Sequence, residues 1–82
     1  MEHVRILYFG PARERTGRDE EDIEVKPGTT VADIREDVRE RFPDMSEFID
    51  ACRIAVDMEY VPDEHPVRSG SELALIPPVA GG

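Results

Sequence analysis

The sequence has few of the residues on which several common kinds of protein depend. It contains one cysteine, one lysine and no tryptophan among its 82 residues. A single cysteine excludes a disulfide framework within one chain. No apolar run approaches the ~18–20 residues that a membrane-spanning helix needs, and Met1–Arg5 lacks the pattern of a signal peptide. These absences predict a cytoplasmic protein with no membrane partner.

Positive charge is also scarce. Ten lysine and arginine residues stand against nineteen aspartate and glutamate residues, which gives a formal net charge of −9. Such a charge repels the phosphates of nucleic acids and anionic membrane surfaces. We therefore expect no nucleic-acid partner. The acidity is typical of a soluble surface, and adaptation to high salt or a basic partner would give the same balance.

The length of the chain suits one small domain with a modest core. Hydrophobic residues make up 39% of the chain and charged residues 35%, whereas about 45–50% and 25% are typical. The hydrophobic residues nevertheless occur in blocks separated by turn-forming segments. This grouping favours a folded domain over a disordered chain.

Strand-like blocks and chain breakers divide the sequence into elements. A short turn or helix is predicted over residues 12–16, and Gly17 can close it in a left-handed conformation. The charged run Arg18–Asp22 is predicted to be a solvated loop. Residues 63–70 are predicted to form turns, with Val67 as an anchor. Strands are predicted at residues 4–9, 23–25, 53–57, 60–61 and 72–76.

The clearest helix is predicted to begin after Thr30. Thr30 and Asp33 have the spacing of a capping box, in which each residue satisfies a backbone N–H of the other. An apolar stripe at helical spacing follows, formed by Val31, Ile34, Val38 and Phe42. Pro43 ends this helix, because a residue before proline avoids the helical conformation. A second short helical segment is expected over residues 44–51.

This order of elements is typical of a β-grasp, or ubiquitin-like, domain of the α+β class. Such a domain packs one main helix on one face of a mixed sheet of four to five strands, with the first and last strands as neighbours. We expect the domain to cover residues 1–77. Residues 78–82 are expected to form a flexible, extended C-terminal tail that ends in Gly-Gly.

Motifs of a self-sufficient catalyst are missing from the sequence. Neither type of glycine-rich phosphate-binding loop is present. His3 and His65 stand alone, with no histidine or cysteine at metal-ligand spacing, so we expect no metal and no bound cofactor. Cys52 is expected to be a small buried hydrophobic residue, and a sulfur-handling thiol is the alternative.

The final segment, Pro-Pro-Val-Ala-Gly-Gly, carries the most specific chemistry. Gly82 has no Cβ, so nothing crowds attack at its carbonyl carbon. Two glycines can pass through a narrow channel of another protein, and Pro77–Pro78 favour an extended chain. Extended, residues 78–82 reach roughly 16–18 Å. This chemistry is consistent with activation of the Gly82 carboxylate as an acyl adenylate that then receives a nucleophile such as sulfur, and an ordinary frayed terminus is the alternative. The tail that delivers this carboxylate consists of Pro78, Val79, Ala80 and Gly81.

A second candidate site lies on the predicted sheet. If Val4, Ile6 and Tyr8 face the helix, the alternate residues of this strand face the other way. The same alternation in the last strand turns Leu73 and Leu75 inward. The outward apolar residues are then Leu7, Phe9, Ala74 and Ile76, and Tyr60 joins them. A contiguous exposed apolar surface marks a partner site. Cover by a loop of the same chain is the alternative, but no loop is long enough.

The sequence resembles the sulfur-carrier small subunits of molybdopterin synthase, in the MoaD/ThiS ubiquitin-like family. The resemblance spans the whole chain, and residues 18–52 are generic. The Pro-Pro-Val-x-Gly-Gly ending is highly specific. The segments that carry it are residues 4–14 (VRILYFGPARE), 63–70 (DEHPVRSG) and 72–82 (ELALIPPVAGG).

The resemblance implies a reaction sequence. An adenylating enzyme of the ubiquitin-activating type uses ATP to convert Gly82 to a glycyl adenylate, and sulfur from a donor protein then makes the 1-thioglycine thiocarboxylate. The tail enters the large subunit of molybdopterin synthase, in a heterotetramer, and its sulfur passes to cyclic pyranopterin monophosphate. The large subunit supplies the catalytic groups, so this chain would be a co-substrate more than a catalyst.

The resemblance also implies roles for individual residues. Phe9, Tyr60 and Ile76 match residues of the family that contact the large subunit. Ile76 stands where the family often has an aromatic residue, so that contact would be altered. Arg13 matches a basic residue near the exit of the tail.

Other interpretations remain open at this stage. A related carrier could serve thiazole, cysteine or tRNA thiolation, and an archaeal-type modifier would be conjugated to lysines. An unrelated β-grasp binding module is a third possibility. A thiazole carrier is typically shorter and lacks the double proline, which favours the molybdopterin interpretation.

Overall fold

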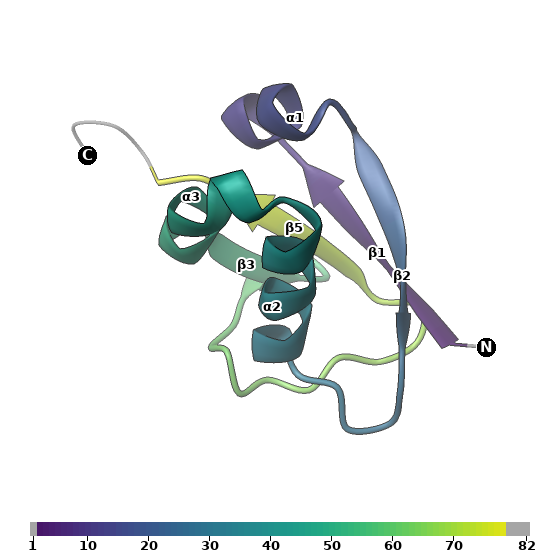
Figure 1. Ribbon diagram of the computed structural model, residues 1–82. Coiled ribbons are helices and arrows are strands. Elements are labelled where there is room, and N and C mark those ends of the chain that lie inside the picture. The colour runs from purple at the N-terminus through teal and green to yellow at the C-terminus, as the bar shows by residue number, and fades with distance from the viewer. Residues whose placement is uncertain (1, 79–82) are drawn as a thin grey trace.

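A computed structural model describes residues 2–78 of the chain (Figure 1). Five strands form one mixed sheet in the order β2-β1-β5-β3-β4. The helices α2 and α3 pack on one face of this sheet (Figure 1). The β-grasp prediction is confirmed, with two short helices beside the main one.

The strands are β1 (Glu2–Tyr8), β2 (Glu20–Val25), β3 (Arg53–Val56), β4 (Glu59–Tyr60) and β5 (Glu72–Ile76). The helices are α1 (Gly10–Thr16), α2 (Val31–Arg41) and α3 (Ser46–Ala51), with a 3-10 turn η1 (Pro43–Met45).

The pairing of the first and last strands sets the position of the tail. β1 and β5 are parallel neighbours, with Ile6 opposite Leu73 and Tyr8 opposite Leu75. β2 and β3 flank this pair, each in an antiparallel arrangement. Because β1 and β5 run in the same direction, the chain leaves β5 at the end of the sheet where β1 also ends. The predicted adjacency of the two strands is confirmed.

The main helix forms where its capping signal predicts. The Thr30 side chain accepts a hydrogen bond from the Asp33 backbone N–H, and the Asp33 carboxylate accepts one from the Thr30 backbone N–H at 3.0 Å. Helix α2 ends at Arg41, and η1 begins at Pro43. The apolar stripe faces the sheet, since Val31, Ile34 and Val38 are buried and Phe42 packs partly buried against the core.

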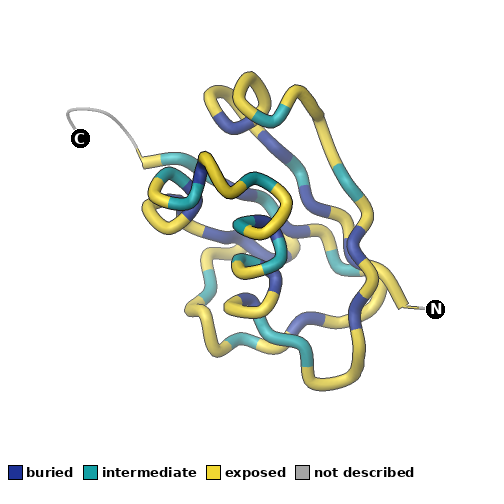
Figure 2. Tube along the Cα trace, viewed as in Figure 1, coloured by how far each residue is buried: buried dark blue, intermediate teal, exposed yellow. Residues whose placement is uncertain are grey.

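The core lies between the helices and the inner face of the sheet (Figure 2). The predicted inward residues of both central strands are buried, as is the anchor Val67. Cys52 is also buried, and burial raises the pKa of its thiol. The prediction of a small buried hydrophobic residue at this position is confirmed. Among residues 2–78, no helix is long and apolar enough to span a membrane.

The prediction of a solvated loop over Arg18–Asp22 is wrong for its second half. Strand β2 begins at Glu20, and Glu21 lies opposite Ile6 with only 8% of its side chain exposed. The Glu21 carboxylate accepts a hydrogen bond from the Tyr8 hydroxyl at 2.8 Å and from Arg41 Nη1 at 2.9 Å. A carboxylate tolerates burial when it is paired in this way. One residue of the charged run, Glu21, therefore has a buried side chain.

Candidate functional site

An apolar row crosses the face of the sheet opposite α2 and α3. Leu7 of β1 lies opposite Ala74 of β5. Ala74 lies opposite Ala55 of β3, and Ala55 lies opposite Tyr60 of β4. Residues opposite one another on neighbouring strands point to the same face of a sheet. The register therefore places these four side chains in one line across four strands.

Leu7, Ala74 and Ala55 form the floor of a shallow groove with a volume of about 380 Å³. Two exposed aromatic residues contribute to its walls, since Phe9 is 50% and Tyr60 54% exposed. Met58, at 95%, is the most exposed large hydrophobic residue among residues 2–78. The groove is lined by Leu7, Phe9, Ala55, Met58, Tyr60, Glu72, Ala74 and Ile76. The structure thus gathers five residues of the predicted patch and adds Ala55 and Met58, which were not predicted.

The junction between β1 and α1 holds Phe9 at the rim of the groove. Phe9 is the N-cap of α1 and has an extended backbone, with φ −118° and ψ 150°. Its carbonyl accepts a hydrogen bond from the Ala12 backbone N–H at 3.0 Å. Helix α1 then closes at Gly17, whose φ of 73° is left-handed as predicted. Strand β1 before Phe9 and helix α1 after it thus hold its backbone, and the side chain is half exposed to solvent.

A tight turn and a stacked guanidinium position Tyr60. Asp57 and Met58 have positive φ angles of 49° and 74°, which turn the chain from β3 into β4. The Asp57 carboxylate ties this turn to β5 by accepting a hydrogen bond from the Glu72 backbone N–H at 3.0 Å. The Arg53 guanidinium lies 3.9 Å from the centroid of the Tyr60 ring. A guanidinium over an aromatic face is attractive, so it limits the rotation of the ring.

Arg13 does not line the groove. It lies on α1 with an exposed side chain, and its Nε atom is 3.1 Å from a carboxylate oxygen of Asp19. An exposed ion pair of this kind is weak and breaks easily. The role near the tail that the resemblance implies for Arg13 stays a prediction.

The groove has a charged border toward the start of β1. Arg5, two residues before Leu7 in β1, lies opposite Glu72 of β5 and opposite Asp22 of β2. The Arg5 Nε atom is 2.9 Å from a Glu20 carboxylate oxygen. The apolar surface therefore occupies the half of this face that lies toward the ends of β1 and β5.

The tail begins at this apolar end of the sheet. Ile76 is the last residue of β5, Pro77 is half-buried and Pro78 is exposed. The predicted activation site at Gly82, together with Val79, Ala80 and Gly81 of the tail, lies outside the described residues. A partner that covers the groove would meet the root of the tail, because Ile76 belongs to both. Within residues 2–78, no cluster of three or more histidine, cysteine or acidic side chains could hold a metal ion.

Two relatives are similar to this chain over its full length. The molybdopterin synthase sulfur carrier subunit of Caenorhabditis briggsae is 33% identical over 84 residues, which cover 100% of both chains. The subunit of the same name from Mycobacterium tuberculosis is 32% identical over 83 residues and is also covered completely.

Solved structures show the same fold. A putative molybdopterin converting factor subunit 1 from Pyrococcus furiosus superposes with a TM-score of 0.85 at 29% identity, covering 96% of this chain and 100% of the other. SAMP1 from Haloferax volcanii gives 0.84 at 24% identity, covering 98% and 99%. A chain from the complex of subunits 1 and 2 of the Helicobacter pylori molybdopterin-converting factor gives 0.71 at 22% identity, covering 98% and 99%.

The sequence profile of the ThiS family matches residues 6–82, which include the end of β1, every later element and the Gly-Gly ending. This match covers nearly the whole chain, and the full-length relatives with more than 30% identity agree with it. The chain is therefore a member of the ThiS family.

Proposed function

We propose that this protein is a sulfur carrier of molybdenum cofactor biosynthesis. Gly82 is adenylated, then converted to a thiocarboxylate, and the thiocarboxylate gives its sulfur to cyclic pyranopterin monophosphate within a molybdopterin synthase complex. The observation that carries the proposal is the position of the apolar groove. The groove ends at Ile76, and this residue directly precedes the Pro-Pro-Val-Ala-Gly-Gly segment. The names of the full-length relatives support the same assignment.

The groove suits a protein partner better than a small substrate. Its floor is apolar, and its two aromatic walls are fixed by the β1–α1 junction and by the stacked Arg53. Rigid aromatic residues in an apolar surface are typical anchors of protein interfaces. The complex from Helicobacter pylori, which contains subunits 1 and 2, supports a large-subunit partner for this chain. We expect two copies of each subunit to form a heterotetramer.

The proposal divides the chemistry among several proteins, as the resemblance to the family implies. The adenylating enzyme binds the ATP, a separate donor protein supplies the sulfur, and the large subunit acts on the pterin. The carrier contributes the reacting carbonyl of Gly82 and the surface that docks it.

The mass of the intact protein tests this proposal. The protein is purified from its own cells and measured with and without an alkylating reagent. A thiocarboxylate replaces one oxygen with sulfur and reacts with the reagent, so we expect a heavier, alkylatable species that maps to Gly82. Deletion of Gly82 should abolish this species and cofactor synthesis while thermal stability stays the same, because Gly82 follows the folded sheet.

Two outcomes would contradict the proposal. The first is an unmodified carboxylate that persists after co-expression with the adenylating enzyme and a sulfur source. The second is Gly82 found mainly in isopeptide bonds to lysines of other proteins, which would assign the chain to the protein modifiers. SAMP1 of Haloferax volcanii shares the fold at 24% identity, and a shared fold leaves the acceptor of the glycine open.

A further inference from the structure

The positive charges of this chain are almost all arginine. Nine arginines accompany one lysine, Lys26. A lysine amine is a nucleophile once it loses its proton, whereas the arginine guanidinium stays protonated in proteins. On the proposed function, Gly82 passes through activated acyl forms, and amines and thiols attack such forms. The positions of the chain's own amine and thiol groups relative to the tail therefore matter.

Lys26 lies at the end of the sheet opposite the tail. It follows Val25, which pairs with Glu2 at the start of β1. The tail leaves β5 beyond Leu75, which pairs with Tyr8 at the end of β1. Figure 1 shows the loop between β2 and α2 at the opposite end of the molecule from the end of β5. With about 3.3 Å for each strand residue, Lys26 is about 25 Å or more from Pro78.

The tail is too short to reach Lys26. The four residues beyond Pro78 span at most about 14 Å when fully extended, and a lysine side chain adds about 6 Å. The sum is less than the separation along the sheet. The only lysine side chain of the protein is thus out of range of Gly82 while the domain is folded.

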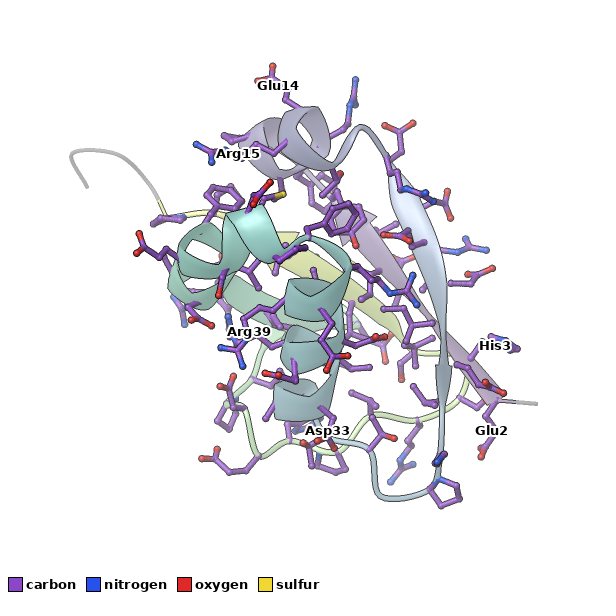
Figure 3. The ribbon with its side chains drawn as sticks, in the orientation of Figure 1. Glu2, His3, Glu14, Arg15, Asp33 and Arg39 are labelled. Carbon is purple, nitrogen blue, oxygen red and sulfur yellow. The ribbon has the colours of Figure 1, made fainter. Side chains whose placement is uncertain are left out.

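Arginine occupies the positions close to the root of the tail. Arg53 lies opposite Ile76, the last residue of β5, and its guanidinium stacks on Tyr60. Arg15 lies on α1, which begins at the same end of the sheet, and its guanidinium lies 4.7 Å from the centroid of the Phe48 ring in α3. Figure 3 shows Arg15 on the side of α1 that faces α3. A lysine at either position would bring an amine within reach of the tail.

The only thiol is also close to the tail in the fold but is covered. Cys52 directly precedes Arg53, so it adjoins the strand end that pairs with Ile76. Its side chain is buried, and burial raises the pKa of the thiol, which keeps it protonated. A buried thiol in its protonated form does not attack an acyl group.

We propose that the surface around the tail root protects the activated glycine from capture by its own chain. Arginine takes the place of a lysine that would be acylated, and the single thiol is enclosed in the core. The activated Gly82 then survives until an external acceptor, on a partner protein or a small molecule, reaches it. Positive charge is kept near the tail without the nucleophile that lysine would supply.

The reaction that this surface prevents is an internal aminolysis. The neutral Nζ atom of a lysine near the tail would attack the Gly82 carbonyl carbon and form a C–N bond. The bond from that carbon to the leaving group breaks, and the leaving group takes the electron pair. The nitrogen loses a proton to solvent. The product is an internal isopeptide, lighter than the free acid by one water.

The test uses a chemically activated chain and needs no partner enzyme. The full chain is made as an intein fusion and released with 2-mercaptoethanesulfonate, which leaves a thioester on Gly82. Each variant is incubated in mildly alkaline buffer and followed by intact mass. We expect Arg53→Lys to form the internal isopeptide at least about tenfold faster than wild type, since a short tether gives millimolar effective concentrations. Arg15→Lys should behave in the same way.

Two matched controls separate position from chemistry. Arg68→Lys makes the same substitution in the loop before β5, where the Gly70 N–H bonds to the His3 carbonyl near the start of β1. The thioester of this variant should hydrolyse at the wild-type rate and form no isopeptide. Arg53→Gln removes the charge without adding an amine, so its thioester should also hydrolyse without forming an isopeptide. The proposal is overturned if wild type cross-links through Lys26 at the rate of Arg53→Lys, or if Arg53→Lys behaves like Arg68→Lys.

Unfolding tests the role of the buried thiol. In concentrated urea Cys52 is exposed, so the wild-type thioester should exchange onto its Sγ atom and release the small thiol, and added thiol should reverse the exchange. Equally fast exchange in the folded protein would overturn the proposal. These readouts do not involve ATP, an adenylating enzyme or a pterin. They therefore stand or fall separately from the search for a native thiocarboxylate on Gly82.

Discussion

Side chains along each strand alternate between the two faces of the sheet, and the two faces differ in what covers them. On the inner face Ile6, Leu73 and Leu75 are buried under the helices. On the outer face Leu7 and Ala74 are half-buried, and Phe9 and Tyr60 are exposed beside them. Apolar residues on an uncovered face do not stabilise the isolated domain as the core does. The inner face maintains the fold, and the outer face is the surface that we propose for the partner.

The largest effect on folding should come from truncating the inner face. Leu73→Ala removes a fully buried side chain and should lower the free energy of unfolding by about 2–5 kcal/mol. Leu7→Ala truncates a side chain on the outer face and should lower the free energy of unfolding by roughly 1 kcal/mol or less. Urea denaturation of both variants measures the difference. Equal losses would mean that the outer face is part of the core.

Phe9→Asp should separate binding from stability. The substitution places an unpaired charge in the proposed interface, so we expect affinity for the large subunit to fall by about tenfold or more. The control is Ala32→Asp, which adds the same charge at an exposed position of α2, away from the groove. Titration calorimetry measures both affinities. Unchanged affinity of Phe9→Asp would remove the groove from the interface.

Stability at alkaline pH should depend on the inner-face residue Tyr8. Burial, together with the hydrogen bond to Glu21 and its negative charge, raises the pKa of the Tyr8 phenol well above its usual value. The folded state thus favours the protonated phenol. This contribution is fully present below about pH 10, the unfolded pKa, and is lost as the pH rises beyond it. Urea denaturation above that pH should show a steeper loss of stability for wild type than for Tyr8→Phe. Parallel curves would contradict this assignment.

The smallest effect is expected at the charged half of the outer face. Arg5 pairs with Glu20 at 2.9 Å, and both side chains are about half exposed. Exposed ion pairs contribute roughly 0–1 kcal/mol. Arg5→Gln should therefore change the free energy of unfolding by less than about 0.5 kcal/mol. A larger loss in the urea experiment would show that this half of the face is structurally important.

Local signals predicted most of the elements. Thr30 and Asp33 fixed the start of α2, and Pro43 fixed its end, because capping and proline geometry act within a few residues. The alternation in β1 and β5, with the expected strand order, also predicted that Leu7 and Ala74 share the outer face. These inferences need only neighbouring residues and the direction of each Cβ.

The features that were missed depend on residues far apart in the sequence. Arg35 on α2 donates hydrogen bonds from Nη1 to the carbonyls of Ile49 at 2.6 Å and Cys52 at 3.0 Å. Its Nη2 donates to Asp63 at 3.1 Å. Glu21 would have been found by continuing the alternation of β2 backward, but the charges around it concealed the pattern. Met58 lies in the groove because of the turn between β3 and β4, and the residues of this turn do not predict its shape.

Neighbouring residues were enough to predict the alternation of the strands and the limits of the main helix, and they place a terminal carboxylate on Gly82. Each of these depends on backbone geometry or on functional groups within a few residues. The three-dimensional fold was needed to show which face the helices cover, which carboxylate is buried and at which end of the sheet the tail begins. Those outcomes depend on contacts between distant segments, such as β1 with β5 and Arg35 with Asp63.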